Sequence, residues 1–408
     1  MNVFDTQAAV GKSYTIQSNS LIRSGTGLIS FDATLEGTNL LTSKFNDEIT
    51  ALALPIAKVN VEGGLGTDRL TGPNSSNSWF IQGLNKGSLG ATLGFNSVEK
   101  LPGGAGNDRY VVTGAGEMQG LIDGGLGNNT LDYSSYALPV TINLQAKTAT
   151  KMAGYQNVKE FVGGTASDTF IAPDLANGWS IQGKNSGQVS NLAQGVFKFS
   201  GFENLQGGTG SDGFQFATTG LVDGNINGKA GIDTLDYSAF TATMAVGVNL
   251  YTGVASRVGG LVSGIENVNG GAGNDIIVGD GQANNFNGNA GRDILIGGLG
   301  ADKLVGGAGE DLLIGGTTAY DKETTMVALT AVMQEWASNE TYTNRRQHLL
   351  GKLNGGKNGS YILSKTLVPE DAALDKLTGG PIDTDWFWAT PLKITDLNAA
   401  SEKIADAV

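Results

Sequence analysis

The most regular hydrophobic pattern in the chain lies between Gly270 and Gly316, where an apolar residue recurs at every ninth position. Five nine-residue units follow one another there: GGAGNDIIV, GDGQANNFN, GNAGRDILI, GGLGADKLV and GGAGEDLLI. Each is a version of GGxGxDxUx with U apolar, so each combines a glycine-rich turn with a short strand. Strand side chains alternate, so the apolar residues at position eight point to one side. They are Ile277, Phe286, Leu295, Leu304 and Leu313.

Two such units, one on each side, would close one turn of a flattened coil. The first, third and fifth units then stack on one edge at the strand spacing of about 4.8 Å, and the second and fourth stack on the other. This stacking aligns the position-six side chains of successive coils in two columns, which we call files. The first file contains Asp275, Asp293 and Asp311, and the second contains Asn284 and Asp302. Without a counter-charge, neighbouring carboxylates in a file repel each other by roughly 4 kcal/mol at intermediate dielectric. We therefore expect a cation between the turns.

Calcium is the metal that suits this pattern. The ligands on offer are hard oxygens from carboxylates and from the carbonyls of the glycine turns, and calcium accepts six to eight of them in flexible geometry. The turn glycines expected at these sites are Gly270, Gly288, Gly297 and Gly306. Zinc-type ligation has no residues to use, because the chain has no cysteine and its one histidine, His348, lies outside the repeats.

Short strands and glycine turns continue upstream in two copies of a unit of roughly a hundred residues, which favours a stacked β architecture over a compact globule. The matching segments are 67–87 with 167–187, 97–112 with 201–216, and 124–136 with 228–240. Single nonads begin at residues 63, 103, 124, 163, 207 and 228, and their position-six residues are Asp68, Asp108, Asn129, Asp168, Asp212 and Asp233. Each of these has two interpretations, as a calcium ligand or as a turn residue that hydrogen-bonds its own backbone.

Trp79 and Trp179 occupy equivalent places in the two long repeats. They are either exposed platforms for sugar rings or aromatic residues packed over a coil. Packing is favoured, because aromatic side chains carry large burial energies and repeats reuse good packing.

The two ends of the chain depart from the repeat pattern. Near the N-terminus, LISFDATL (28–35) and EITALALPIAKV (48–59) carry apolar residues at strand-like spacing, as in first coils or a cap that shields an open end. After Gly316, helical spacing predicts a helix over 321–337 with Asp321 as N-cap and a second over 341–353. The remaining predictions are strands in SYILSKTLV (360–368) and DWFWAT (385–390), and a structural or surface role for His348 in the second helix.

Composition narrows the classes of function. The chain of 408 residues carries 63 glycines and a net charge of -13, a balance that opposes nucleic acid and anionic membranes as partners and suits a protein that binds cations. No run approaches the 18 or so apolar residues of a membrane span, and the N-terminus lacks the pattern of a Sec-type signal. Because there is no cysteine, calcium would have to replace disulfides as the stabilising element outside a cell.

The chain resembles the RTX (repeats-in-toxin) family of bacterial secreted proteins. The resemblance rests on the nonads at 270–316, on the flanking phrases TLDYS and GIENV, and on LNGGKNGSYIL followed by LDKLTGGPIDTDWFWAT in the tail. It implies a parallel β-roll, calcium-dependent folding, and export by a type I ABC transporter that reads an uncleaved C-terminal signal, here roughly 320–408. GDGQANNFN departs from the motif, so weaker binding is expected at the edge shared by Asn284 and Asp302. GGPIDTD sets Asp385 one place late, so no site is assigned to it.

These patterns predict an all-β protein, an elongated right-handed parallel β-helix or β-roll solenoid with a small α+β C-terminal domain. The expected segments are an N-terminal cap (1–58), a β-helix of two long repeats (59–269), a tandem calcium roll (270–316) and a C-terminal secretion-signal domain (317–408).

A structural or adhesive role outside the cell or at its surface is favoured. The expected partners are several calcium ions, the exporter, and cell-surface polysaccharide or further copies of the chain. The alternatives are a self-assembling surface-layer or fibre subunit, and the C-terminal segment of a larger secreted enzyme or adhesin. An enzyme is disfavoured, because no HExxH or GxSxG motif is present. A catalytic pair of aspartates is also disfavoured, since all aspartates have a turn or ligand role available.

Overall fold

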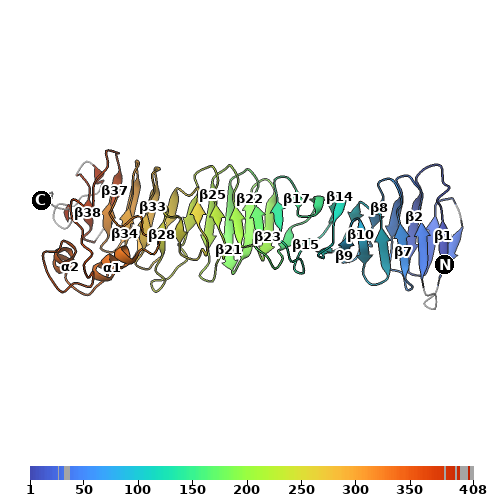
Figure 1. Ribbon diagram of the computed structural model, residues 1–408, viewed down its shortest axis with the longest axis horizontal. Helices are drawn as coiled ribbons and strands as arrows, with labels where there is room; N and C mark the ends of the chain where they lie inside the picture. The colour runs from blue at the N-terminus through green and yellow to red at the C-terminus, as the bar shows by residue number, and fades with distance from the viewer. Residues whose placement is uncertain (26, 32–36, 381–382, 391–392, 396–402, 405–408) are drawn as a thin grey trace. The chain divides into compact units, whose positions relative to one another are not determined.

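The computed structural model describes residues 1–25, 27–31, 37–380, 383–390, 393–395 and 403–404. The chain forms two compact units: unit 1 comprises Met1–Pro173 and Leu192–Asn204, and unit 2 comprises Asp174–Asn191 and Leu205–Val408. In each unit, short strands stack in parallel ladders, as Figure 1 shows, so the predicted all-β, parallel β-roll class is confirmed.

Unit 1 contains four sets of strands. One parallel ladder joins β1 (Asn2–Phe4), β5 (Thr38–Leu41), β7 (Val59–Glu62) and β11 (Leu93–Asn96). A second joins β2 (Ser13–Gln17), β6 (Glu48–Ala51) and β8 (Arg69–Thr71), and the antiparallel strands β3 (Ser20–Arg23) and β4 (Leu28–Ser30) extend it from β2. The predicted strand LISFDATL (28–35) includes residues 32–35, which lie outside the described residues.

The other two sets contain the hairpins that interrupt the parallel stack. A third ladder joins β9 (Ser78–Gly83), β13 (Arg109–Val112), β15 (Thr130–Asp132), β19 (Glu160–Val162) and β23 (Gly195–Ser200), while β10 (Lys86–Leu89) runs antiparallel between β9 and β11. A fourth set joins β12 (Leu101–Pro102), β14 (Met118–Asp123) and β18 (Met152–Gln156), then β17 (Thr148–Ala149), β16 (Thr141–Asn143) and β20 (Thr169–Ile171).

Unit 2 contains two long parallel ladders. One joins β21 (Asn177–Gly183), β25 (Asp212–Phe216), β27 (Thr234–Asp236), β31 (Asn267–Asn269), β33 (Asn285–Ala290), β35 (Lys303–Ala308) and β37 (Lys376–Thr378). The other joins β28 (Gly247–Asn249), β32 (Ile276–Val278), β34 (Ile294–Ile296), β36 (Leu312–Ile314), β38 (Trp386–Trp388) and β39 (Lys403–Ile404). The remaining strands are β22 (Ser186–Asn191), β26 (Ile226–Asn227), β29 (Val254–Ala255) and β30 (Val262–Ser263), together with β24 (Asn204–Gln206), whose first residue belongs to unit 1.

The tandem nonads alternate between these two ladders, as their spacing predicts. The first, third and fifth supply β32, β34 and β36, and the second and fourth supply β33 and β35. The residues at position eight are all fully buried. Alternate units therefore stack on separate edges.

Trp79 and Trp179 are packed inside the coils, which confirms the favoured interpretation. Trp79 is 0% exposed and stacks on Tyr110, its register partner in β13, with ring centroids 5.8 Å apart. Trp179 is 1% exposed and stacks on Phe214, its register partner in β25, at 5.4 Å. Each long repeat thus contains the same kind of aromatic stack at the equivalent position.

The C-terminal helices are shorter than the sequence predicts. Helix α1 covers Val327–Trp336 and α2 covers Tyr342–Leu349. The prediction of Asp321 as N-cap is wrong, because its buried carboxylate accepts hydrogen bonds from the backbone and hydroxyl of Thr318, and α1 begins after Met326 instead. Residues 360–368 form no strand, whereas 385–390 contain β38 as predicted.

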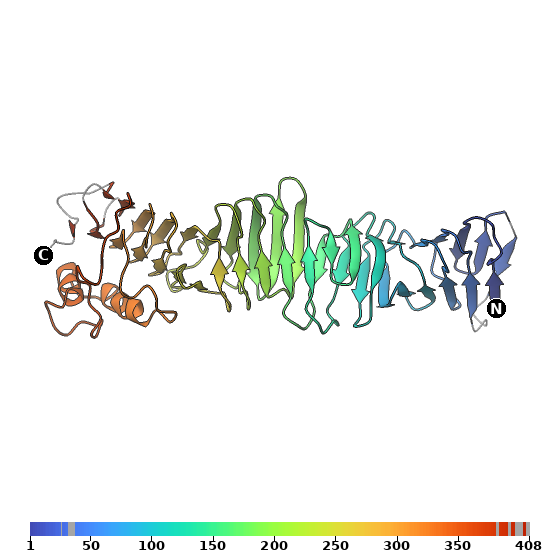
Figure 2. The same ribbon diagram turned by 45° about the horizontal axis from the view of Figure 1, so that its top comes forward.

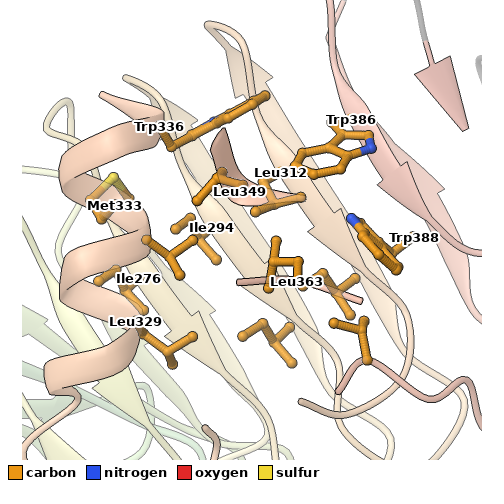
Figure 3. Packing of buried hydrophobic residues seen from close by; sticks show 14 of the residues in the cluster. Ile276, Ile294, Leu312, Leu329, Met333, Trp336, Leu349, Leu363, Trp386 and Trp388 are labelled. Carbon is orange, nitrogen blue, oxygen red and sulfur yellow. The ribbon is translucent and has the colours of Figure 1, made fainter. Parts of the chain in front are cut away.

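Helix α1 packs on the outer face of the β32–β34–β36–β38 sheet, and Figure 2 shows both helices beside the last coils of unit 2. Positions seven and nine of the odd nonads point away from position eight because strand side chains alternate, and here they are apolar too. Figure 3 shows Leu329, Met333 and Trp336 of α1 over Ile276 and Ile294 of that face. Trp386 and Trp388 continue the same cluster.

Candidate metal centre

The first file of aspartates lies at the start of β32, β34 and β36. The strands are in register, with Ile277 opposite Leu295 and Leu295 opposite Leu313, so the residue two places before each comes level with its neighbours. The backbone N–H of Asp275 donates to Oδ1 of Asp293 at 2.8 Å, and that of Asp293 donates to Oδ1 of Asp311 at 2.8 Å. The structure therefore brings together the three aspartates predicted for this edge.

The second file lies on the other edge. The backbone N–H of Asn284 donates to Oδ1 of Asp302 at 2.8 Å, and the backbone N–H of Asp302 donates to Oδ1 of Asp375 at 3.0 Å. The predicted pair is therefore also adjacent, and a further aspartate follows it.

The second carboxylate oxygen of several file members has no partner among the described residues. Asp293, Asp302 and Asp311 are at most 1% exposed, and within the described part of the chain Oδ2 of each accepts no hydrogen bond. A buried carboxylate oxygen without a donor costs several kcal/mol unless it is protonated or meets a cation. Asp275 differs, because its Oδ2 accepts from the backbone N–H of Gly271 at 2.6 Å.

Burial and mutual repulsion raise the pKa values of these carboxyl groups. Burial, then the charges of Asp311 and Asp275, raise the pKa of Asp293 to about 10. Burial is also the largest cause that raises the pKa of Asp311 to about 8, of Asp302 to about 7 and of Asp275 to about 6. At neutral pH the files therefore carry protons, unless a cation compensates their charge.

The first glycine of each nonad makes room for oxygen atoms of two coils. A Cβ at Gly288 would lie 2.2 Å from Oδ2 of Asp293 and 2.5 Å from the carbonyl oxygen of Gly306. The same clash with the nonad's own carboxylate arises at the other glycines predicted for the sites, Gly270, Gly297 and Gly306. A carboxylate and a carbonyl from the next coil thus converge there, and this donor set of hard oxygens fits calcium.

Glycines at positions two and four shape the turn itself. In the fourth nonad Gly298 has φ 96° and Gly300 has φ 113°, values in the left-handed region that side chains disfavour. Across the described residues, no three His, Cys, Asp or Glu side chains gather as a metal cluster. An ion in the files would therefore take main-chain carbonyls in addition to carboxylates.

The isolated nonads form shorter versions of the same arrangement. In unit 1 the backbone N–H of Asp47 donates to Oδ1 of Asp68 at 2.7 Å, and that of Asp108 donates to Oδ1 of Asn129 at 2.8 Å. In unit 2 the backbone N–H of Asp212 donates to Oδ1 of Asp233 at 2.7 Å.

The isolated positions differ in the hydrogen-bond partner of Oδ2. Oδ2 of Asp68, Asp108 and Asp233 accepts no hydrogen bond from any described residue, as in the tandem files. Oδ2 of Asp168 and Asp212 instead accepts a backbone N–H of its own turn, from Gly164 and Gly208. The turn-residue interpretation thus has direct support at these two positions, and the ligand interpretation at the other three stays a prediction.

Sequence reasoning missed two aspartates that extend the tandem files. Asp375 follows Asp302, and Oδ1 of Asp385 accepts from the backbone N–H of Asp311 at 2.8 Å. Leu312 pairs with Trp386, so Asp385, the residue before Trp386, comes level with Asp311 despite the extra residue in GGPIDTD. A signal for Asp375 was present, because ADKLVGG at 301–307 recurs as LDKLTGG at 374–380.

A family model described as RTX calcium-binding nonapeptide repeat (four copies) matches residues 262–295 and 287–317. This confirms the RTX repeats and calcium as the metal that they bind. The isolated nonads lie outside the matched residues. No curated protein matches the chain. Among the helices described, none is long and apolar enough to cross a membrane.

Proposed function

From its RTX calcium-binding repeats, we propose that the chain is a secreted protein that folds when it meets calcium outside the cell and has a structural or adhesive role there. The observation that carries the proposal is the file in which Asp293 lies buried between Asp275 and Asp311. The unfolded chain has no such site, so calcium binding contributes directly to the free energy of folding.

Circular dichroism in chelator and at millimolar calcium tests the folding step. We expect a largely disordered spectrum in chelator at pH 8 and a β spectrum with calcium. Without a cation, the fold at pH 8 has to keep protons on buried carboxyl groups such as Asp293 that the unfolded chain releases, and this lowers its stability. Identical folded spectra under both conditions would show that the files need no ion.

Export through a type I ABC transporter is the second part of the proposal, with the signal within 317–408. RTX repeat proteins are typically secreted, and a chain without calcium stays unfolded enough to be threaded. Co-expression with such a transporter tests it: the full chain should reach the medium, and a chain lacking residues 396–408 should stay in the cell. An Asp293→Asn variant is the control, because it perturbs folding after export and leaves the signal intact. Equal export with and without 396–408 would contradict a signal there.

An adhesive role is supported by a groove in unit 1. It has a volume of about 510 Å³ and its lining includes Asn2, Asn39 and Asn60, Phe4 and Lys86. The three asparagines form a side-chain ladder, in which Asn60 donates to Asn39 at 3.1 Å and Asn39 donates to Asn2 at 2.9 Å. Exposed amides beside a 66% exposed Phe4 suit the hydroxyl groups and apolar faces of a polysaccharide.

Binding of the calcium-loaded protein to purified cell-surface polysaccharides tests this role. Asn39→Ala should weaken binding by roughly tenfold, since one amide with a good hydrogen bond contributes about 1.4 kcal/mol. Asn74→Ala, at an exposed site outside the groove, is the matched control. Assembly into large particles on calcium addition, without polysaccharide binding, would favour the surface-layer or fibre alternative.

A further inference from the structure

Among the described residues, Asp375 is the last member of the second file, and it lies where the chain returns to the roll after the helices. Asp375 has the geometry of a file member: its Oδ1 accepts the backbone N–H of Asp302 at 3.0 Å, and Lys376 pairs with Lys303 in the adjoining strands. A Cβ at Gly315 would lie 2.7 Å from its Oδ2, as at the first glycine of a nonad. By position alone, Asp375 would be a calcium ligand.

The oxygen that would face an ion is already bonded to a lysine. Nζ of Lys393 donates to Oδ2 of Asp375 at 3.0 Å, and it lies 3.4 Å from Oδ1 of Asp371. Lys393 is only 6% exposed, so its ammonium group is enclosed. Asp302, one coil away, has an Oδ2 that accepts no hydrogen bond from the described residues. The two neighbouring carboxylates of one file thus have different surroundings.

The enclosed ammonium stays charged. Burial by itself lowers the pKa of Lys393, but the hydrogen bond to Asp375 and the charges of Asp375 and Asp371 outweigh burial and raise it. A charged ammonium within hydrogen-bond distance of a carboxylate oxygen neutralises that carboxylate and repels a divalent ion that would approach the same oxygen.

We propose that Lys393 is a built-in cation that takes the place of calcium at Asp375. The second file therefore ends in a coil that is held by an ion pair inside the chain, while the coils before it depend on calcium. This inference rests on the proposed calcium sites of the files. It assigns a different requirement to the last coil, which closes without metal.

Counting bound calcium on the full chain tests the inference, by equilibrium dialysis with a direct calcium assay and with folding followed by circular dichroism. Lys393→Met keeps the bulk of the side chain and removes its charge, so Asp375 becomes available to an ion. We expect this variant to bind one more calcium than the wild-type chain. Lys376→Met is the control. Lys376 is exposed at the start of β37, next to Asp375, so its replacement should leave the number of bound calcium ions unchanged.

A double variant, Lys393→Met with Asp375→Asn, removes both charges and should return to the wild-type number. It also decides the case if Lys393→Met alone does not fold, because one calcium fewer than wild type would show that Asp375 was a ligand all along. A folded Lys393→Met chain with the wild-type number would likewise overturn the inference. Failure of the wild-type chain to bind calcium would instead refute the proposed function, so the two failures are distinguishable.

Discussion

Replacement of Asp293 by asparagine separates the two effects of the buried file. Asparagine keeps an oxygen that can accept the backbone N–H of Asp275, which the carboxylate accepts at 2.8 Å, but it removes one negative charge from the centre of the stack. The calcium-free fold should gain stability, since folding at neutral pH no longer requires a proton on this buried carboxyl group. The calcium-bound fold should lose affinity, since one carboxylate serves the gaps on both sides of its coil.

The pKa of Asp293 gives the size and sign of the first effect. Burial raises this pKa from 3.8 to about 10, so the folded chain at pH 7 must keep a proton that the unfolded chain releases. The interval from the unfolded pKa of 3.8 to pH 7 is about 3 pH units, and at 1.36 kcal/mol per unit the calcium-free fold loses about 4 kcal/mol of stability. Because the pKa is raised in the fold, the contribution of Asp293 to calcium-free stability is fully present below pH 3.8 and is lost as the pH rises toward 10.

Calcium titration followed by circular dichroism, together with urea unfolding in chelator, measures both effects. We expect Asp293→Asn to retain more β structure in chelator at pH 7. The calcium affinity of the folded chain, obtained from the two measurements together, should fall roughly tenfold, which corresponds to about 1.4 kcal/mol. Asp236→Asn is the matched control, because Asp236 belongs to the same unit and accepts hydrogen bonds from Ser238 and Gln215 outside the file. An unchanged calcium affinity, with no gain of structure in chelator, would refute a cation between these coils.

Three further outcomes are expected. In chelator, acidification from pH 8 to pH 5 should increase the β structure seen by circular dichroism. The pKa is raised to about 7 for Asp302 and to about 10 for Asp293, so the fold binds protons more tightly than the unfolded chain does. A flat pH profile would contradict this reasoning. Gly288→Ala should prevent calcium-induced folding, since its Cβ would meet a carboxylate oxygen at 2.2 Å, whereas Gly281→Ala, with open space around its Cβ, should fold like wild type. Trp336→Ala should lower the free energy of unfolding in calcium by about 3–5 kcal/mol in urea titrations, as expected for a fully buried aromatic ring.

The tandem repeats were predictable because their structure is local. A nine-residue period fixes one turn and one strand, and two such units fix a coil, so the alternation of edges and the files at Asp293 and Asp302 follow from spacing. The rest depends on partners that are distant in sequence. Asp375 comes level with Asp302, 73 residues earlier, only because the chain returns to the roll after the insertion that holds both helices, and Lys393 reaches Asp375 from 18 residues further along the chain. The recurrence of ADKLVGG as LDKLTGG is a local signal for Asp375, but the contact of Lys393 has no local pattern.

The helical region shows a different limit. Asp321 has the composition of an N-cap, but Thr318 offers a backbone and a hydroxyl donor three residues away, and a buried turn uses the carboxylate first. The packing of α1 over the β32–β34–β36–β38 sheet, by contrast, is indicated by the sequence pattern of that sheet. Odd nonads end in IIV, ILI and LLI, so the positions on either side of the inward residue are apolar as well, whereas even nonads carry Asn285 and Lys303 at position seven. An apolar outer face on one ladder only predicts that something packs over it.

That packing and the first file meet at Glu310, the residue before Asp311. Its carboxylate lies 2.8 Å from Arg292 and 2.5 Å from Arg345, and its carbonyl accepts the indole N–H of Trp336 at 2.7 Å. The next residue is Asp311. Burial is the largest cause that raises the pKa of Asp311, and the charge of Glu310 raises it further. An ion at Asp311 would stabilise the turn that carries Glu310, and the docked helix holds the same turn from outside. We therefore expect calcium binding at Asp311 and docking of α1 to be thermodynamically linked, so that each strengthens the other by the same factor.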